Sequence, residues 1–181
     1  SGEQVAGYLD HALAQSERVG TLIHYSETHD NSRLAAKGRE WSLLRNRLSA
    51  LVSVKGGFGF ANGVEWLADE QINVHSARGL NWGAEDNIVL ELAQLNRLLN
   101  QHPCFRDGAQ LERMSAPDSK LYHLRRTSAD DDTEVRVIAN LDADEGQAVG
   151  DALIGWVDLL SGNIFEGGSV RPWAVLCLAP E

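Results

Sequence analysis

The sequence predicts a composite α+β fold, with an α/β part over residues 1–106 and an all-β part over residues 107–181. In the first part, segments with helical spacing of apolar residues alternate with short runs rich in β-formers, which indicates parallel strands linked by crossover helices. In the second part, short alternating or β-branched segments are separated by turn clusters, which indicates a small antiparallel sandwich or barrel. We expect the boundary near Cys104–Gly108.

The α/β part begins with a predicted helix and a predicted strand. Apolar side chains recur at helical spacing from Val5 to Leu13, and Gly20 separates them from an apolar run at Thr21–Tyr25. A second helix is expected to begin at a cap on Asn31 or Ser32. Its apolar stripe consists of Trp41, Leu44, Leu48, Leu51 and Val52.

A second strand and a third helix complete this part. Residues 54–63, VKGGFGFANG, are too rich in glycine for a helix and apolar enough for a buried strand. The following helix is expected to be capped by Asp86 and to end at His102-Pro103. Its apolar face consists of Ile88, Leu92, Leu95 and Leu99.

The all-β part is predicted from segments that read as strands. They are KLYHLRR, TEVRVIANL, DALIGWVDLLSG and RPWAVLCLAP, with SADDD and DADEGQ as turns between them. Trp156 and Trp173 fall in these segments, where core packing is the expected role and sugar binding the alternative.

Charge and composition exclude several classes of partner. The chain has 16 basic and 26 acidic residues and a formal net charge of −10, so a phosphate backbone or an anionic membrane surface would be repelled. No apolar run is long enough to span a membrane and no leader pattern is evident, so we expect a soluble, cytoplasmic protein. Cys104 and Cys177 are widely separated and are expected to be buried free thiols, with a single disulfide as the alternative.

A group of titratable residues follows the first predicted strand. Glu27, His29, Asp30 and Arg33 lie where that strand would end, which is where ligand-binding loops gather in parallel α/β folds. An acceptor, a donor and a fixed cation could hold a polyhydroxylated ligand or stabilise positive charge. The alternative is that Asp30 caps a helix and His29 fills space. A metal site built from His24, His29 and Asp30 is a weaker possibility, and no metal or cofactor is predicted.

Two motifs resemble a known family. HYSETHDNSR, residues 24–33, resembles the conserved stretch of the α-amylase family, glycoside hydrolase family 13, in which an apolar strand ends in F-x-x-N-H-D with an arginine shortly after. Residues 56–65, GGFGFANGVE, are similar to the later family stretch G-x-P-x-x-Y-Y-G-x-E. The departures are Thr28 for asparagine, Phe58 for proline and Ala61-Asn62 for two tyrosines.

The rest of the chain continues the resemblance. LNRLLNQHPCF is similar to the helix that closes the family's barrel, and DLLSG followed by RPWAVLCL resembles its C-terminal sandwich. The resemblance therefore implies a partial (β/α)₈ barrel segment, of about two strands and three helices, followed by an antiparallel β-sandwich.

The resemblance also implies an activity and roles for three residues. The family acts on α-linked glucans by a retaining mechanism. Asp30 would be a catalytic carboxylate that steadies the oxocarbenium-like transition state, and His29 would donate a hydrogen bond to a sugar hydroxyl. Arg33 would contribute to substrate binding or position the loop.

The same resemblance implies that the chain alone is inactive. A retaining glycosidase needs a nucleophile and a general acid/base about 5 to 5.5 Å apart, and the family takes both from strands upstream of any segment present. We therefore expect the C-terminal portion of a longer hydrolase or glucanosyltransferase, with hydrolysis, transglycosylation and phosphorolysis left open. The alternative is a non-catalytic module that binds carbohydrate or mediates assembly.

Two further expectations concern exposed surfaces. Barrel strands and helix faces that lack neighbours would be open to water, so we expect the chain to rearrange, to self-associate through these edges, or to retain order chiefly in the β part. Trp66 and Trp82 could form sugar platforms, although burial is the more common role of such side chains.

Overall fold

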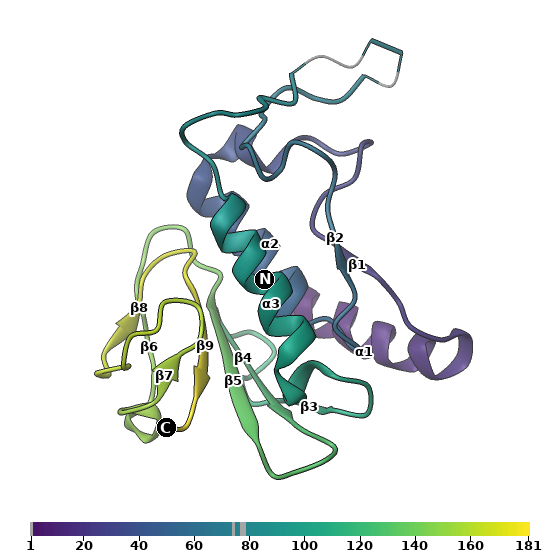
Figure 1. Ribbon diagram of the computed structural model, residues 1–181. Coiled ribbons are helices and arrows are strands. Elements are labelled where there is room, and N and C mark those ends of the chain that lie inside the picture. The colour runs from purple at the N-terminus through teal and green to yellow at the C-terminus, as the bar shows by residue number, and fades with distance from the viewer. Residues whose placement is uncertain (1, 74, 77–78) are drawn as a thin grey trace.

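A computed structural model describes residues 2–73, 75–76 and 79–181. Its three α-helices precede most of the strands, and an antiparallel sheet dominates the second half (Figure 1). This confirms the α+β class. The elements in order are α1 (Gly2–Val19), β1 (His24–Tyr25), η1 (Leu34–Lys37), α2 (Arg39–Leu51), β2 (Phe58–Gly59), α3 (Val89–Gln101), η2 (Pro103–Phe105), β3 (Gln110–Arg113), β4 (Leu121–Thr127), β5 (Glu134–Asn140), β6 (Gln147–Ala148), η3 (Asp151–Leu153), β7 (Val157–Asp158), β8 (Ser169–Val170) and β9 (Val175–Ala179).

The helices form because each carries an apolar stripe that a neighbour buries. In α1 the buried positions follow helical spacing at Ala6, Leu9 and Ala12. In α3 they are Leu92, Leu95 and Leu99. The helix α3 ends before Pro103, as predicted, because proline lacks an amide hydrogen and restricts the residue before it.

Both predicted helix caps are wrong. The residue preceding α2 is Gly38 rather than Asn31 or Ser32, because a 3₁₀ turn at Leu34–Lys37 intervenes. The residue preceding α3 is Ile88, and Asp86 instead pairs with Arg39 of α2 at 2.7 Å. At α3 a contact with a distant segment outweighs the local capping preference, whereas at α2 the intervening turn displaces the start of the helix.

The five-stranded sheet has the order β3-β4-β5-β9-β7, and all of its pairs are antiparallel. Side chains of β4 alternate, with Tyr122, Leu124 and Arg126 buried against the helices. A separate antiparallel pair joins β6 to β8. The expected antiparallel strands are therefore present.

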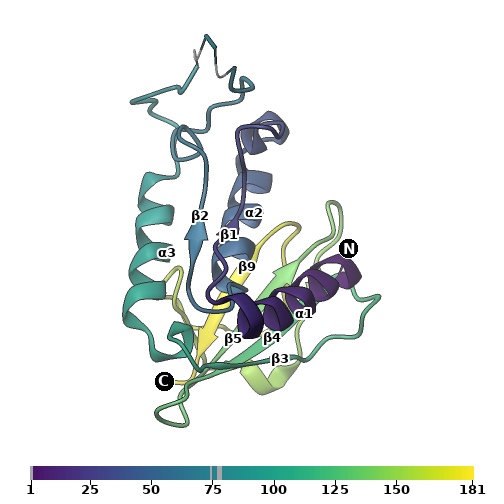
Figure 2. The ribbon, with the colours of Figure 1, turned by 90° about the vertical axis from the view of Figure 1, so that its right-hand side faces the viewer.

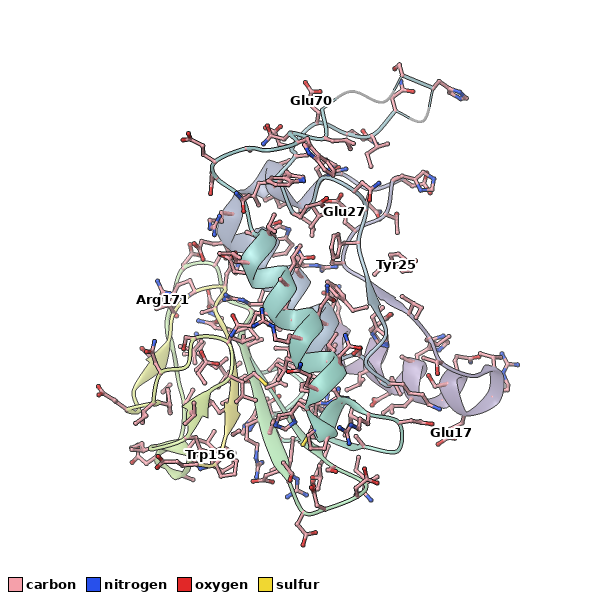
Figure 3. The ribbon with its side chains drawn as sticks, viewed as in Figure 1. Glu17, Tyr25, Glu27, Glu70, Trp156 and Arg171 are labelled. Atoms are coloured by element: carbon pink, nitrogen blue, oxygen red, sulfur yellow. The ribbon has the colours of Figure 1, made fainter. Side chains whose placement is uncertain are left out.

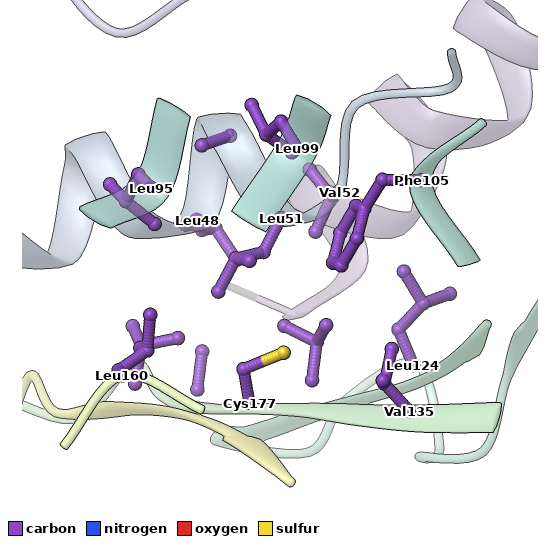
Figure 4. Packing of buried hydrophobic residues seen from close by; sticks show 14 of the residues in the cluster. Leu48, Leu51, Val52, Leu95, Leu99, Phe105, Leu124, Val135, Leu160 and Cys177 are labelled. Atoms are coloured by element: carbon purple, nitrogen blue, oxygen red, sulfur yellow. The ribbon is translucent and has the colours of Figure 1, made fainter. Parts of the chain in front are cut away.

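One apolar core joins the helices to the sheet. Figure 4 shows Leu51 and Leu95 facing Leu124, Val135 and Cys177 across the layer. A smaller cluster on the other face of the sheet contains Ile138, Val149, Leu153, Val170 and Leu178. The sheet therefore has buried side chains on both faces.

A buried arginine links the sheet to the end of α2 through hydrogen bonds. The Arg126 side chain donates to Leu51 O at 3.0 Å, Ser53 O at 2.7 Å and Cys104 O at 2.8 Å, and its guanidinium lies 4.4 Å from the centre of the Phe105 ring. Because burial disfavours its charged form, the pKa of Arg126 is lowered to about 10. It remains a cation at neutral pH, and carbonyl oxygens at the negative end of the helix favour it.

The cysteines and two tryptophans have packing roles. Cys104 and Cys177 are free and buried, as expected, and burial raises the pKa of both thiols. Trp173 packs edge-on against Trp41 of α2, with ring centres 5.5 Å apart, and Trp156 lies against the smaller cluster. Packing is thus the observed role of Trp156 and Trp173.

Among the described helices, none is long and apolar enough to cross a bilayer.

Candidate functional site

Two short parallel strands position the candidate site. In β1 and β2, His24 lies opposite Phe58 and Tyr25 opposite Gly59, and Figure 2 shows the two strands side by side. The Ser26 amide extends the pairing by donating to Gly59 O at 3.1 Å. Because the strands are parallel, the chain leaves both of them at the same edge. The loop of residues 26–33 and the loop of residues 60–88 therefore begin next to each other.

The first of these loops is anchored in the protein interior. The Ser26 hydroxyl donates to Asn46 Oδ1 of α2 at 2.8 Å, and Asn46 Nδ2 donates to Ser42 O at 2.8 Å. All three side chains are buried. A buried polar chain of this kind restricts the direction in which the loop leaves β1.

A buried ion pair lies beneath the loop. Arg33 Nε lies 3.1 Å from Glu27 Oε1, with 0% and 1% of the two side chains exposed. The Leu34 amide donates to the other oxygen of Glu27 at 2.6 Å. Burial raises the pKa of Glu27, and the Leu34 amide and the Arg33 cation oppose that shift. Figure 3 shows Glu27 at the end of the molecule where the long loop with Glu70 begins.

Arg33 also holds the second loop. Its Nε donates to Ala68 O at 3.2 Å and its Nη2 to Asn62 O at 2.9 Å. A Cβ on Gly63 would lie 2.7 Å from Arg33 Nη2, and Gly63 has a φ of +93°, so glycine is required there. One cation thus ties loop 26–33 to loop 60–88.

The predicted catalytic carboxylate is on the surface above this pair. Asp30 Oδ1 lies 3.2 Å from His29 Nε2, and the two side chains are 81% and 59% exposed. A turn presents them: the Asn31 amide donates to Thr28 O at 3.2 Å, and the Thr28 hydroxyl donates to Asn31 Oδ1 at 2.7 Å. Thr28, one of the departures from the family pattern, therefore has a local role.

His29 and Asp30 border an open cavity of about 480 Å³. The other lining residues are Gln71, Ile72 and Asn73 of loop 60–88. The cavity therefore combines a carboxylate, an imidazole and two side-chain amides, a set that can donate to and accept from sugar hydroxyls. Sequence reasoning did not single out the three loop residues, because they follow no motif.

The predicted site residues thus separate into two groups. His29 and Asp30 lie together at the cavity, whereas Arg33 is buried and contacts Glu27 and the two loop carbonyls. This geometry favours the loop-positioning role of Arg33 over the substrate-binding role. Glu27 belongs to the titratable group that the sequence predicts, but the sequence pattern does not predict its pairing with Arg33.

The residues of the weaker metal alternative do not come together. His24 is buried, and its Nε2 accepts a hydrogen bond from the Val54 amide at 3.3 Å. Burial lowers the pKa of His24, with a further contribution from the Arg126 cation. His29 and Asp30 are on the surface. In the described part of the chain, no group of three or more His, Cys, Asp or Glu side chains could hold a metal ion.

A second cavity is lined mainly by residues of α1, α2 and β1. It has a volume of about 320 Å³ and a largely apolar lining. Tyr8 of α1 and Tyr25 of β1 are 51% and 57% exposed beside it, and Figure 3 shows Tyr25 on the side of the strand away from α3. The other lining residues are Gln4, Val5, His24, Trp41, Leu44, Arg45, Leu48, Ser49, Val52 and Leu141.

Comparisons with known proteins show which fold this is. No family model and no curated protein matches the sequence. Among solved structures, an α-amylase from Lactobacillus plantarum has a TM-score of 0.67 and 14% identity, over 97% of this chain and 42% of its own. A maltogenic α-amylase from Thermotoga neapolitana has a TM-score of 0.70 and 17% identity, over 95% of this chain and 45% of its own.

A third similar structure is a γ-CGTase from Bacillus clarkii, with a TM-score of 0.64 and 11% identity over 86% of this chain and 25% of its own. This chain therefore spans less than half the length of these solved structures. The predicted resemblance to the α-amylase family is confirmed at the level of the fold: the chain has the fold of part of the α-amylase-type structures.

Proposed function

We propose that this chain is the C-terminal part of an α-amylase-type glycoside hydrolase or glucanosyltransferase that acts on α-linked glucans by a retaining mechanism. In this proposal β1 and β2 are the seventh and eighth strands of a (β/α)₈ barrel. The parallel pairing of these strands and the fold shared with α-amylase-type structures support it.

One observation carries the proposal. Asp30 and His29 are presented side by side on a surface turn at the carboxyl end of β1, above a buried ion pair that fixes the turn. A carboxylate held this way is suited to electrostatic work, because it need not reorganise when positive charge develops on a substrate. In the proposed reaction Asp30 faces the sugar ring and stabilises the oxocarbenium-like transition state, while His29 donates to a sugar hydroxyl.

The same geometry explains why the chain alone should be inactive. Asp30 is 81% exposed, and water screens an interaction between opposite charges 4 Å apart to about 1 kcal/mol, against about 4 kcal/mol near a protein surface of lower effective dielectric constant. Efficient stabilisation needs walls that exclude water. A nucleophile and a general acid/base are also required, and in the proposal all of these come from upstream barrel strands.

Arg33 is a positioning residue in this proposal. Its contacts with Glu27, Ala68 and Asn62 set the relative positions of the two loops that border the cavity. Because such a residue acts through the loops, its replacement should alter substrate affinity and turnover together.

Replacement of Asp30 by Asn in the longer protein tests the proposal. We expect kcat to fall about a hundred- to thousandfold, the usual cost of losing one preorganised electrostatic group, with folding unchanged because Asp30 is exposed. Asp86→Asn is the matched control, since Asp86 is also exposed and forms only a surface pair with Arg39. Near-normal turnover of Asp30→Asn would refute the assignment.

The alternative of a non-catalytic module that binds carbohydrate through its β part has less support. Trp156 and Trp173 motivated it, and both are engaged in packing. A Trp156→Ala variant that lost saturable binding of a maltooligosaccharide without losing stability would favour this alternative.

A further inference from the structure

Loop 60–88 presents a tryptophan that is largely exposed although its ring contacts a second tryptophan. Trp82 is 75% exposed, and its ring centre lies 5.6 Å from that of Trp66, with the ring planes tilted by 41°. Trp66 is more enclosed, and its indole nitrogen is shielded from solvent. An exposed indole ring offers apolar area that a ligand can bury, at about 25 cal/mol per Å².

The backbone around the pair is held firmly. Asn81, in the left-handed conformation with a φ of +51°, donates from Nδ2 to Trp66 O at 2.8 Å and accepts from the Ala84 amide at 3.1 Å. The Trp66 amide donates to Gly63 O at 3.1 Å, and the Ile88 amide donates to Glu65 O at 2.9 Å. Trp82 therefore lies in a turn that several hydrogen bonds hold in place, which lowers the entropic cost of binding a ligand.

This loop is the one that borders the candidate site. Gln71, Ile72 and Asn73 line the cavity together with His29 and Asp30, and Arg33 joins the loop to the site through Asn62 and Ala68. The tryptophan pair and these lining residues therefore belong to a single loop fastened to the Asp30 turn.

We infer that Trp82, backed by Trp66, is a stacking platform for a glucosyl ring of the glucan chain, beyond the ring that Asp30 faces. The chemistry fits because one face of a pyranose carries mainly C–H groups, which pack on an indole ring while the hydroxyls stay in water. The inference rests on the proposed function for the identity of the sugar as an α-glucan. It adds a binding residue that contributes to affinity and takes no part in bond cleavage.

One equally exposed apolar side chain lacks this chemistry. Leu90, on the surface of α3, is 79% exposed, as much as Trp82, but is a flexible aliphatic group with no aromatic partner. Leu90 therefore provides a matched control for loss of exposed apolar surface.

The test is a titration of the 181-residue chain with maltoheptaose, in which saturation-transfer NMR measures the binding. We expect millimolar affinity and a loss of about tenfold in Trp82→Ala, the equivalent of burying one sugar face. Trp82→Phe should retain part of the affinity, whereas Leu90→Ala should match the unsubstituted chain. Because Trp82 and Leu90 are exposed, neither variant should unfold.

The results separate this inference from the proposed function. Loss of binding in Trp82→Ala, with binding retained in Asp30→Asn, would support the platform. If the unsubstituted chain does not bind maltoheptaose, or if Trp82→Ala binds as well as Leu90→Ala, the platform is refuted. The effect of Asp30→Asn on turnover in the longer protein would still decide the proposed function independently.

Discussion

Arg33 and Glu27 form a buried ion pair in which Arg33 Nε lies 3.1 Å from Glu27 Oε1, and this pair organises the candidate site without touching its cavity. Glu27 fixes the start of the 3₁₀ turn through the Leu34 amide, and Arg33 fixes the facing loop through two carbonyl groups. The surface turn with His29 and Asp30 lies between these anchors. The chemistry proposed for Asp30 therefore depends on a pair of residues that no substrate would contact.

Replacement of Glu27 by Gln should destabilise the fold. The change leaves the Arg33 cation buried without its counter-charge, and breaking a buried pair typically costs about 3–5 kcal/mol. Chemical denaturation monitored by circular dichroism measures the loss. Glu17→Gln, on the exposed surface of α1, is the control and should change the free energy of unfolding by less than about 0.5 kcal/mol. Equal stability of the two variants would contradict the anchoring role.

Replacement of Arg126 and of its neighbour Arg125 by Met tests whether Arg126 joins the sheet to α2. Arg126→Met should remove on the order of 3 kcal/mol from the free energy of unfolding, because three buried carbonyl groups lose their donor. Arg125 points to the opposite face and pairs with Glu112 near the surface, so Arg125→Met should cost at most about 1 kcal/mol. Similar losses in both variants would show that Arg126 does not join the sheet to α2.

The stability of the protein should fall in mild acid because of His123. Burial, with a contribution from the Arg136 cation, lowers the pKa of His123 to about 4, below the value of 6.5 for a free histidine. Between these values the unfolded chain binds a proton that the folded chain excludes, so the contribution is fully present above pH 6.5 and decreases as the pH falls towards 4. Allowing for partial exposure, the loss is about 2 kcal/mol.

Denaturant titrations at pH 7 and pH 4.5 measure this contribution. In His123→Gln, the difference in stability between the two values should be smaller than in the unsubstituted chain. His11→Gln alters an exposed side chain of α1 and should preserve the full difference. An unchanged difference in His123→Gln would assign the acid sensitivity to other groups.

The exposed apolar surface around β1 should mediate self-association. β1 pairs with β2, and Ile23 and Tyr25 cover Gly57 and Gly59 on one face of this pair, where they remain 50% and 57% exposed beside Tyr8 of α1, which is 51% exposed. Sedimentation velocity should show concentration-dependent association that Tyr25→Lys reduces. Ile154→Lys replaces a residue that is also 50% exposed but lies in the β part, and it should have no effect. A purely monomeric chain at high concentration would contradict this expectation.

Local patterns predicted the elements of this fold better than the contacts between them. The end of α3 before Pro103 could be predicted because proline acts on the residues next to it. The cap at Asn31 or Ser32 was wrong because the first amide of the 3₁₀ turn, that of Leu34, is satisfied by Glu27, seven residues earlier. Spacing alone does not indicate whether a glutamate folds back in this way.

The sequence predicted the residues of the candidate site better than the contacts that they make. The sequence motif singled out His29 and Asp30, and the structure brings them together at one cavity. The motif did not distinguish the exposed Asp30 from the buried Arg33, because burial depends on loop 60–88, which is distant in sequence. The exposure of Trp82 could not be predicted for a similar reason: tryptophan is far more often buried.

The central claim is that Asp30 faces a glucosyl ring on which positive charge develops. The most direct measurement compares two ligands of the longer protein in calorimetric titrations, a cationic iminosugar that mimics the transition state and a neutral maltooligosaccharide. We expect Asp30→Asn to weaken binding of the cation at least a hundredfold and that of the neutral sugar less than tenfold, because the carboxylate acts on charge. Equal weakening of both ligands, or no weakening of either, would contradict the account.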